Sequence, residues 1–126
     1  MLLFDRPTSI KASLSDLVSK KQILKQADSY ISSPIPHITD CQCPRSTGTI
    51  HDFYSEGDYW WPNPKTSNGL PFIRKDGQSN PENFSSHRLI LRNMRNQVSS
   101  LALAYRLTGN ETYAAHAVLI LQEFFI

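Results

Sequence analysis

Residues 56–82 hold the side chains of this sequence that are best suited to binding a ligand. Trp60 and Trp61 stand side by side there. An indole presents a flat apolar face on which the C–H patches of a sugar ring can stack, and the nearby Asn63 and Asp58 could hydrogen-bond hydroxyl groups. Neighbouring prolines restrict the backbone, so less entropy is lost when the segment closes on a ligand. The alternative is that the indoles only pack this segment onto a core, but we expect at least one to face a binding cleft.

Two further side chains complete the candidate binding set. The guanidinium of Arg74 can pair bidentately with a carboxylate. A structural ion pair with Asp76 or Glu56 explains the same residue equally well. Tyr59, directly before the tryptophans, belongs to the same aromatic cluster. The candidate substrate-binding residues are therefore Tyr59, Trp60, Trp61, Asn63 and Arg74.

Other residues of catalytic or metal-binding type favour structural roles. His87, at the start of a predicted helix, is more typical of a capping or packing residue than of a base, and His116 stands among alanines. Cys41 and Cys43 are only two positions apart, which makes a mutual disulfide geometrically awkward. A metal site needs more ligands than this pair offers. We interpret both as free or partner-seeking thiols, and the sequence indicates no metal ion and no organic cofactor.

Three amphipathic stretches predict the helices that would position the candidate residues. Residues 13–31, 86–107 and 111–126 each carry an apolar stripe, and Gly109 suits the turn between the last two. Residues 32–84 hold seven of the eight prolines and keep no helical or strand period, yet they are rich in aromatic side chains that must pack against something. The pattern predicts an all-α domain with an antiparallel helical hairpin, and with a long aromatic, proline-rich loop between its first and second helices.

Composition excludes several classes of protein. At 126 residues the chain amounts to one domain at most, and 40% hydrophobic with 19% charged residues is typical of a globular protein. A net charge of +2 is too weak and too dispersed to favour nucleic-acid binding. No apolar run approaches the roughly 20 residues that cross a bilayer, and the opening MLLFDRPTS lacks the apolar core of a signal peptide.

The end of the sequence predicts a longer parent protein. Phe124, Phe125 and Ile126 end a predicted helix with bulky apolar side chains and no cap. The three helices would also bury little among themselves. We therefore expect an N-terminal fragment. Two N-glycosylation sequons, at Asn83 and Asn110, are compatible with secretion.

Three stretches, EGDYWWPNP, GLPFIRKDGQSNPE and LALAYRLTGNETYAAHAVLILQEFF, resemble the N-terminal part of the alginate lyase-like family of polysaccharide lyases. The resemblance covers about residues 50–126, and residues 13–31 match more loosely. It implies a partial (α/α) toroid of antiparallel helical hairpins, secreted or periplasmic in the full-length protein. It also implies cleavage of uronic-acid polysaccharide, of the alginate or glucuronan type, by β-elimination. The catalytic residues of such relatives come from later in the chain, so we expect them beyond Ile126.

β-Elimination requires groups that neutralise the uronate carboxylate, remove the C5 proton and serve the leaving oxygen. Within the loop the candidates for such work are Tyr54, Tyr59, His51, Arg74 and Lys75. We expect the fragment alone to be inactive, and its full-length parent to be a monomer that binds acidic polysaccharide but neither nucleic acid nor membrane. The alternatives are a non-catalytic carbohydrate-binding module that uses the same tryptophans, or a helical interaction module, which leaves the aromatic loop unexplained.

Overall fold

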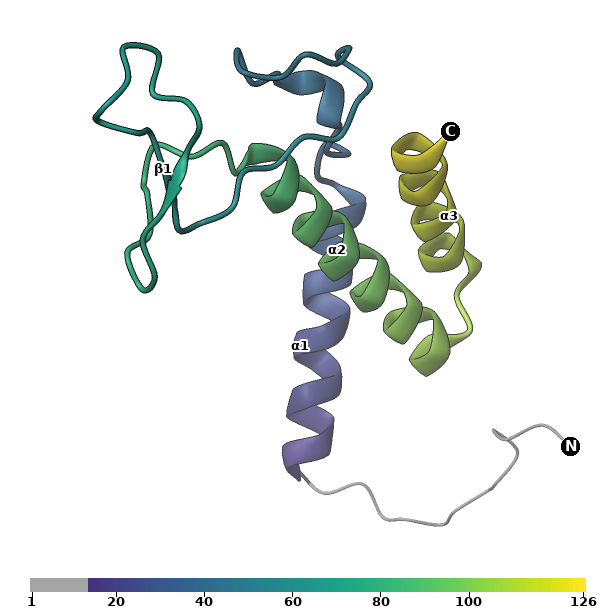
Figure 1. Ribbon diagram of the computed structural model, residues 1–126. Helices are drawn as coiled ribbons and strands as arrows, with labels where there is room; N and C mark the ends of the chain where they lie inside the picture. Colours follow the sequence, from purple (N-terminus) through teal and green to yellow (C-terminus); the bar gives the residue numbers. More distant parts are fainter. Residues whose placement is uncertain (1–13) are drawn as a thin grey trace, which may run out of the picture. The chain divides into compact units, whose positions relative to one another are not determined.

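The computed structural model describes residues 14–126 (Figure 1). These residues form two compact units, one containing residues 14–34 with 97–118 and the other residues 35–96 with 119–126. The described part of the chain is mostly helical, with three α-helices, one 3₁₀ helix and two short strands. None of its helices is long and apolar enough to cross a membrane.

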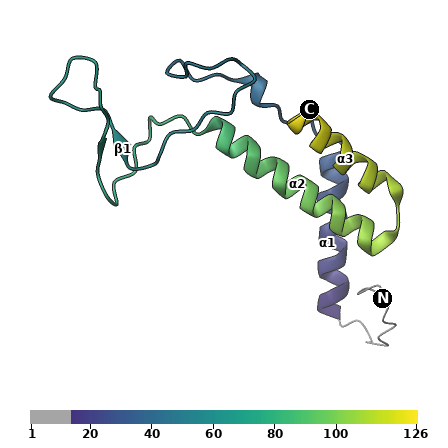
Figure 2. The ribbon, with the colours of Figure 1, turned by 45° about the vertical axis from the view of Figure 1, so that its right-hand side comes forward.

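The helices lie close to the predicted ranges. Helix α1 spans Leu14–Ile31, helix α2 spans Ser86–Thr108 and helix α3 spans Glu111–Phe125. Residue 13, where the prediction started the first helix, lies outside the described residues. The chain reverses direction between α2 and α3 (Figure 2), where Gly109 adopts the left-handed φ of +68° that a glycine tolerates best. Asn110 Oδ1 then accepts a hydrogen bond of 3.0 Å from the Thr112 N–H and so caps α3.

The buried faces of α2 and α3 agree in part with the apolar stripes of the sequence, since Met94, Leu101, Tyr113 and Ala117 are buried as expected. The same stripes also include Ala102, Tyr105 and Leu121, but these three residues are exposed. Ala104 and Ile120 are fully buried instead. The reason is that one turn of helix holds 3.6 residues, so neighbouring apolar positions compete for the same side and the packed neighbours decide between them.

Each unit has a small core of its own. In the first unit the Tyr113 hydroxyl donates a 2.7 Å hydrogen bond to Asp28 Oδ1, which ties α3 to α1. The buried residues around this contact are Ala27, Gln97, Leu101, Ala104, Tyr113 and Ala117. In the second unit the buried residues are Cys43, Glu56, His87, Met94 and Ile120. A glutamate and a histidine in so small a core point to a built polar network.

The segment between α1 and α2, which we expected to be a loop, contains short regular elements, while the described chain is mostly helical as predicted. These elements are a 3₁₀ helix, η1, at Ile38–Asp40, and two strands, β1 at Trp60–Trp61 and β2 at Ile73–Arg74. The strands pair antiparallel, with Trp60 opposite Arg74 and Trp61 opposite Ile73. Strands of two residues are too short to show alternation in a sequence, which is why the pattern gave no sign of them. We call residues 57–80, which include both strands, the ribbon.

Candidate functional site

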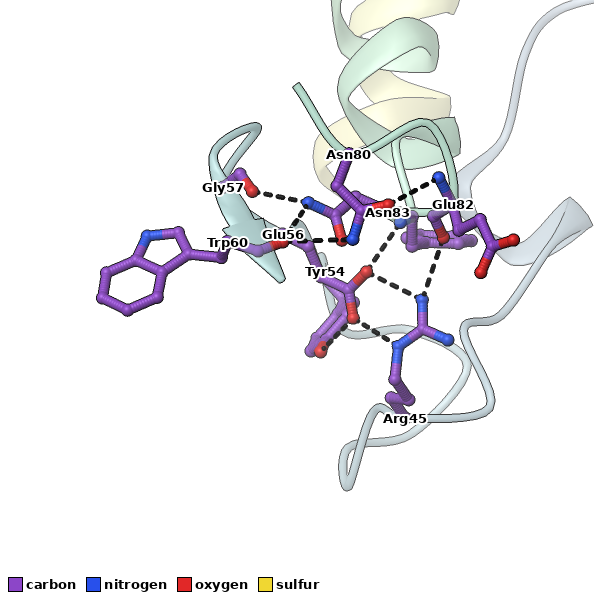
Figure 3. A network of polar contacts seen from close by, with 9 residues as sticks. Arg45, Tyr54, Glu56, Gly57, Trp60, Asn80, Glu82 and Asn83 are labelled. Carbon is purple, nitrogen blue, oxygen red and sulfur yellow. Dashed lines mark hydrogen bonds and ion pairs between the residues drawn. The ribbon is translucent and has the colours of Figure 1, made fainter. Parts of the chain in front are cut away.

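The carboxylate of Glu56 is the centre of a polar network in the second unit (Figure 3). Arg45 approaches it bidentately, with Nε 2.6 Å from Oε1 and Nη2 2.8 Å from Oε2. The Phe84 N–H donates to Oε2 at 2.7 Å and the Tyr54 hydroxyl donates to Oε1 at 3.1 Å. Only 6% of the Glu56 side chain is exposed. Because four hydrogen bonds satisfy both oxygens, this buried carboxylate joins three segments that are distant in the sequence.

The network sets the protonation states of its members. The hydrogen bonds from Arg45, Phe84 and Tyr54 outweigh burial and lower the pKa of Glu56 to about 2. Its carboxylate in turn raises the pKa of the Arg45 guanidinium. Burial, and then the hydrogen bond to Glu56, raise the pKa of the Tyr54 hydroxyl. Tyr54 therefore stays protonated at neutral pH and is poorly suited to the role of base.

His87 is a structural residue, as the sequence favoured. Its side chain lies at the start of α2 with 1% of the residue exposed. Nδ1 accepts a 2.9 Å hydrogen bond from the Tyr54 N–H, so Nε2 carries the proton and donates to the Cys41 carbonyl at 2.8 Å. The Phe84 ring meets the imidazole edge-on, with 4.9 Å between centroids. Both nitrogens are engaged, and the histidine serves to hold residues 41 and 54 together.

Two asparagines fix the backbone of β1. Asn80 Nδ2 and Asn83 Nδ2 both donate to the Trp60 carbonyl at 3.1 Å, and Asn83 Nδ2 also donates to the Gly57 carbonyl at 2.6 Å. Asn80 Nδ2 contacts Asn83 Oδ1 at 3.1 Å. In a glycosylated sequon the sugar is attached to the side-chain nitrogen of the asparagine. In Asn83 this nitrogen is used within the fold, where it holds the turn that leads into Trp60.

An open pocket of about 670 Å³ lies beside the Glu56 network. One side of it is the indole of Trp60, which extends away from the polar contacts in Figure 3 and is 44% exposed. The ring lies against Gly57, where an added Cβ would be 2.5 Å from the indole Cδ1. Glycine is therefore required at position 57 for this position of the indole. The pocket is lined by Arg45, Tyr54, Glu56, Gly57, Trp60, Asn68, Leu70, Pro71 and Phe72.

Among the five predicted binding residues, Trp60 is the one that lines this pocket. Trp61 is half-buried, and its Nε1 donates to the Gln78 carbonyl at 2.8 Å. The Lys75 ammonium lies 4.9 Å from the centroid of the Trp61 ring. The two indoles differ because neighbouring residues of a strand point to opposite faces. Trp61 therefore packs within the ribbon, as the alternative interpretation of the sequence allowed for one indole.

The other three predicted residues form part of the ribbon. Arg74 Nε lies 2.6 Å from Asp76 Oδ1, one of the two ion pairs that the sequence left open. Asn63 donates its N–H to the Gly69 carbonyl at 2.8 Å and accepts the Lys65 N–H on Oδ1 at 3.0 Å, so it shapes the turn between the strands. The Tyr59 carbonyl accepts the Lys75 N–H at 2.8 Å.

Sequence reasoning missed Arg45 and the apolar wall of the pocket. Arg45 stands eleven residues before its partner Glu56, in a segment without any regular period, and no spacing rule joins two such positions. The ion pair between Arg45 and Glu56 is the centre of the polar contacts at this site.

Cys41 and Cys43 are both free, and residues 14–126 contain no group of three or more His, Cys, Asp or Glu side chains placed to hold a metal ion.

Comparison with known proteins identifies the family. The family model for alginate lyase matches residues 38–126, so the chain belongs to the alginate lyase family. The crystal structure of an alginate lyase from Bacteroides ovatus is similar, with 40% sequence identity and a TM-score of 0.71. The similarity covers 86% of this chain and 29% of that one, so the chain spans less than a third of the length of that relative. No curated protein sequence matches the chain.

Proposed function

We propose that this chain is part of a polysaccharide lyase that cleaves uronic-acid polysaccharide, of the alginate or glucuronan type, by β-elimination. Membership of the alginate lyase family supports the class of enzyme. In the complete protein this segment supplies the first helices of an (α/α) toroid and a surface that binds the substrate. The complete protein is a monomer and acts outside the cytoplasm, where such polymers occur.

The observation that carries the substrate-binding role is the open indole of Trp60. Its neighbour Trp61 is held within the ribbon by a hydrogen bond to Gln78, whereas Trp60 faces the pocket. An exposed tryptophan held by a rigid backbone is suited to stacking on the C–H face of a sugar ring. The Asn80 and Asn83 amides on the Trp60 carbonyl provide this rigidity and lower the entropic cost of binding.

We place the catalytic groups outside this segment, as the family resemblance implies, and the contacts of Tyr54 and His87 support this. In β-elimination a base removes the C5 proton beside the uronate carboxylate, the C4–O bond breaks, and an acid protonates the departing oxygen. The Tyr54 hydroxyl donates to an ionised carboxylate, and both nitrogens of His87 are occupied by the backbone. Neither residue is therefore free to carry a proton to or from a sugar.

Analysis of the reaction products tests this proposal. The complete gene product is incubated with alginate and with polyglucuronate, and the oligosaccharides are examined by ultraviolet absorbance and mass spectrometry. β-Elimination gives absorbing, unsaturated ends and products lighter by one water than those of hydrolysis. Shorter products with saturated ends would identify a hydrolase. Binding of oligouronates without any cleavage would identify a non-catalytic carbohydrate-binding protein.

A further inference from the structure

We infer that the Trp60 pocket is a charge-blind subsite, one that binds a sugar ring through its face and its hydroxyl groups and does not recognise the ring's carboxylate. This inference rests on the proposed function, because it takes a polysaccharide as the ligand. It concerns specificity: an enzyme for an acidic polymer is expected to meet each carboxylate with a cation, and this pocket does not.

Among the described residues, Arg45 is the one guanidinium that lines the pocket, and it is already neutralised. The Nε and Nη2 edge of Arg45, the fork that would hold a carboxylate, is occupied by both oxygens of Glu56 at 2.6 and 2.8 Å. Arg45 Nη2 also contacts the Glu82 carbonyl at 3.4 Å. A sugar carboxylate at this place would have to displace Glu56 or lie beside its negative charge. Both alternatives are unfavourable, since Glu56 is buried and depends on Arg45 as its cation.

Three other cations of the ribbon and its surroundings have partners of their own, and the remaining lysine of the ribbon, Lys65, does not line the pocket. Arg74 pairs with Asp76 at 2.6 Å, and Arg88 Nη2 pairs with Asp58 Oδ1 at 2.7 Å. Lys75 lies over the ring of Trp61. The expectation that Arg74 clamps a substrate carboxylate therefore finds no support in its contacts, because its nearest anion is supplied by the same turn.

The rest of the pocket wall is uncharged. Gly57, Trp60 and the run Leu70, Pro71 and Phe72 supply an apolar surface. Asn68 supplies an amide, whose Oδ1 accepts the Leu70 N–H at 3.0 Å, so its Nδ2 is an uncharged donor suited to a hydroxyl group. The lining thus offers ring stacking and neutral hydrogen bonds. Recognition of the carboxylate, which β-elimination requires, must come from residues elsewhere in the complete protein.

Calorimetric titration of the complete gene product tests the inference. The two ligands are an oligouronate and the same oligomer with its carboxyl groups reduced to primary alcohols, and the variants are Trp60→Ala and the conservative Trp60→Phe. Loss of the indole face should weaken the binding of both ligands by the same factor, about tenfold. Trp60→Phe should weaken both equally and by less. The inference would be overturned if Trp60→Ala weakened binding of the oligouronate several times more than binding of the reduced oligomer. It would also be overturned if the substitution left the binding of both ligands unchanged.

A second measurement needs the oligouronate alone. The factor by which Trp60→Ala weakens its binding should be the same at low and at high salt, because screening does not affect stacking. A factor that shrinks as salt is added would show that the pocket attracts the charge. Cleavage by the wild-type protein is assayed in parallel. If Trp60→Ala weakens binding by the same factor at low and at high salt but the wild type cleaves nothing, the inference stands and the proposed lyase activity is refuted. If the two factors differ and the wild type cleaves the polymer, the inference is refuted and the lyase activity stands.

Discussion

Replacement of Glu56 by glutamine should loosen the whole segment that carries the pocket. Glutamine keeps the shape of the side chain but removes its charge. Arg45 donates to both oxygens of Glu56, so the NH₂ group of glutamine must face the Arg45 guanidinium in either orientation, and in one of them it also faces the Phe84 N–H. The site would then lose charge-assisted hydrogen bonds and hold two donors against each other.

The size of the effect follows from the pKa of Glu56. A fall from 4.5 to about 2 corresponds to at most about 3 kcal/mol, since each pH unit is worth about 1.4 kcal/mol. The Arg45 side chain is 48% exposed, so solvent reduces the interaction, and we expect the free energy of local unfolding to fall by about 2 to 3 kcal/mol.

Amide hydrogen exchange of the complete gene product, followed by mass spectrometry over residues 45–84, measures this change directly. Exchange there should become about 30- to 150-fold faster in Glu56→Gln. Asp76→Asn is the matched control, because it neutralises an anion of an exposed ion pair and should stay within about twofold of the wild type. Exchange in Glu56→Gln as slow as in the control would refute the reasoning that the buried carboxylate holds the segment together.

Three further outcomes are expected. The pKa of Glu56 is lowered by folding, so its stabilisation is complete above about pH 4.5 and is lost as pH falls toward 2. Acid titration of tryptophan fluorescence should show this loss, and Glu56→Gln should make it smaller. His87→Ala leaves the Tyr54 N–H and the Cys41 carbonyl without a partner and opens a cavity. The free energy of unfolding, measured with denaturant, should therefore fall by about 3 to 5 kcal/mol. A fall of less than about 1 kcal/mol would contradict the structural role of His87. Gly109→Ala meets open space but must adopt a φ of +68°, so it should lower stability by about 1 kcal/mol, and an unchanged thermal midpoint would contradict this.

The helices could be predicted because each carries many turns of one repeating pattern. Gly109 marked the turn between α2 and α3, and it adopts the left-handed φ that its residue type allows. The exact buried positions could not be predicted, as the exchange of Leu121 for Ile120 illustrates. A shift of one residue changes the direction of a side chain by about 100°, and only the neighbouring elements determine which direction is packed.

The pocket was only partly predictable. Its aromatic residue could be found because tryptophans are rare and stood in a turn-rich segment, but Trp60 and Trp61 could not be told apart without the strand that directs them to opposite faces. The ion pair between Arg45 and Glu56 joins positions with no periodic relation. Such contacts depend on how the chain folds back on itself, and a local pattern contains no information about that.

The steady-state kinetics of Trp60→Ala in the complete gene product test the central claim most directly. If this segment supplies a substrate-binding surface through the exposed indole, KM for a uronic-acid polymer should rise about tenfold, since about 1.4 kcal/mol of stacking is lost, while kcat changes much less. An unchanged KM, with or without a fall in kcat, would contradict the account and place substrate binding elsewhere.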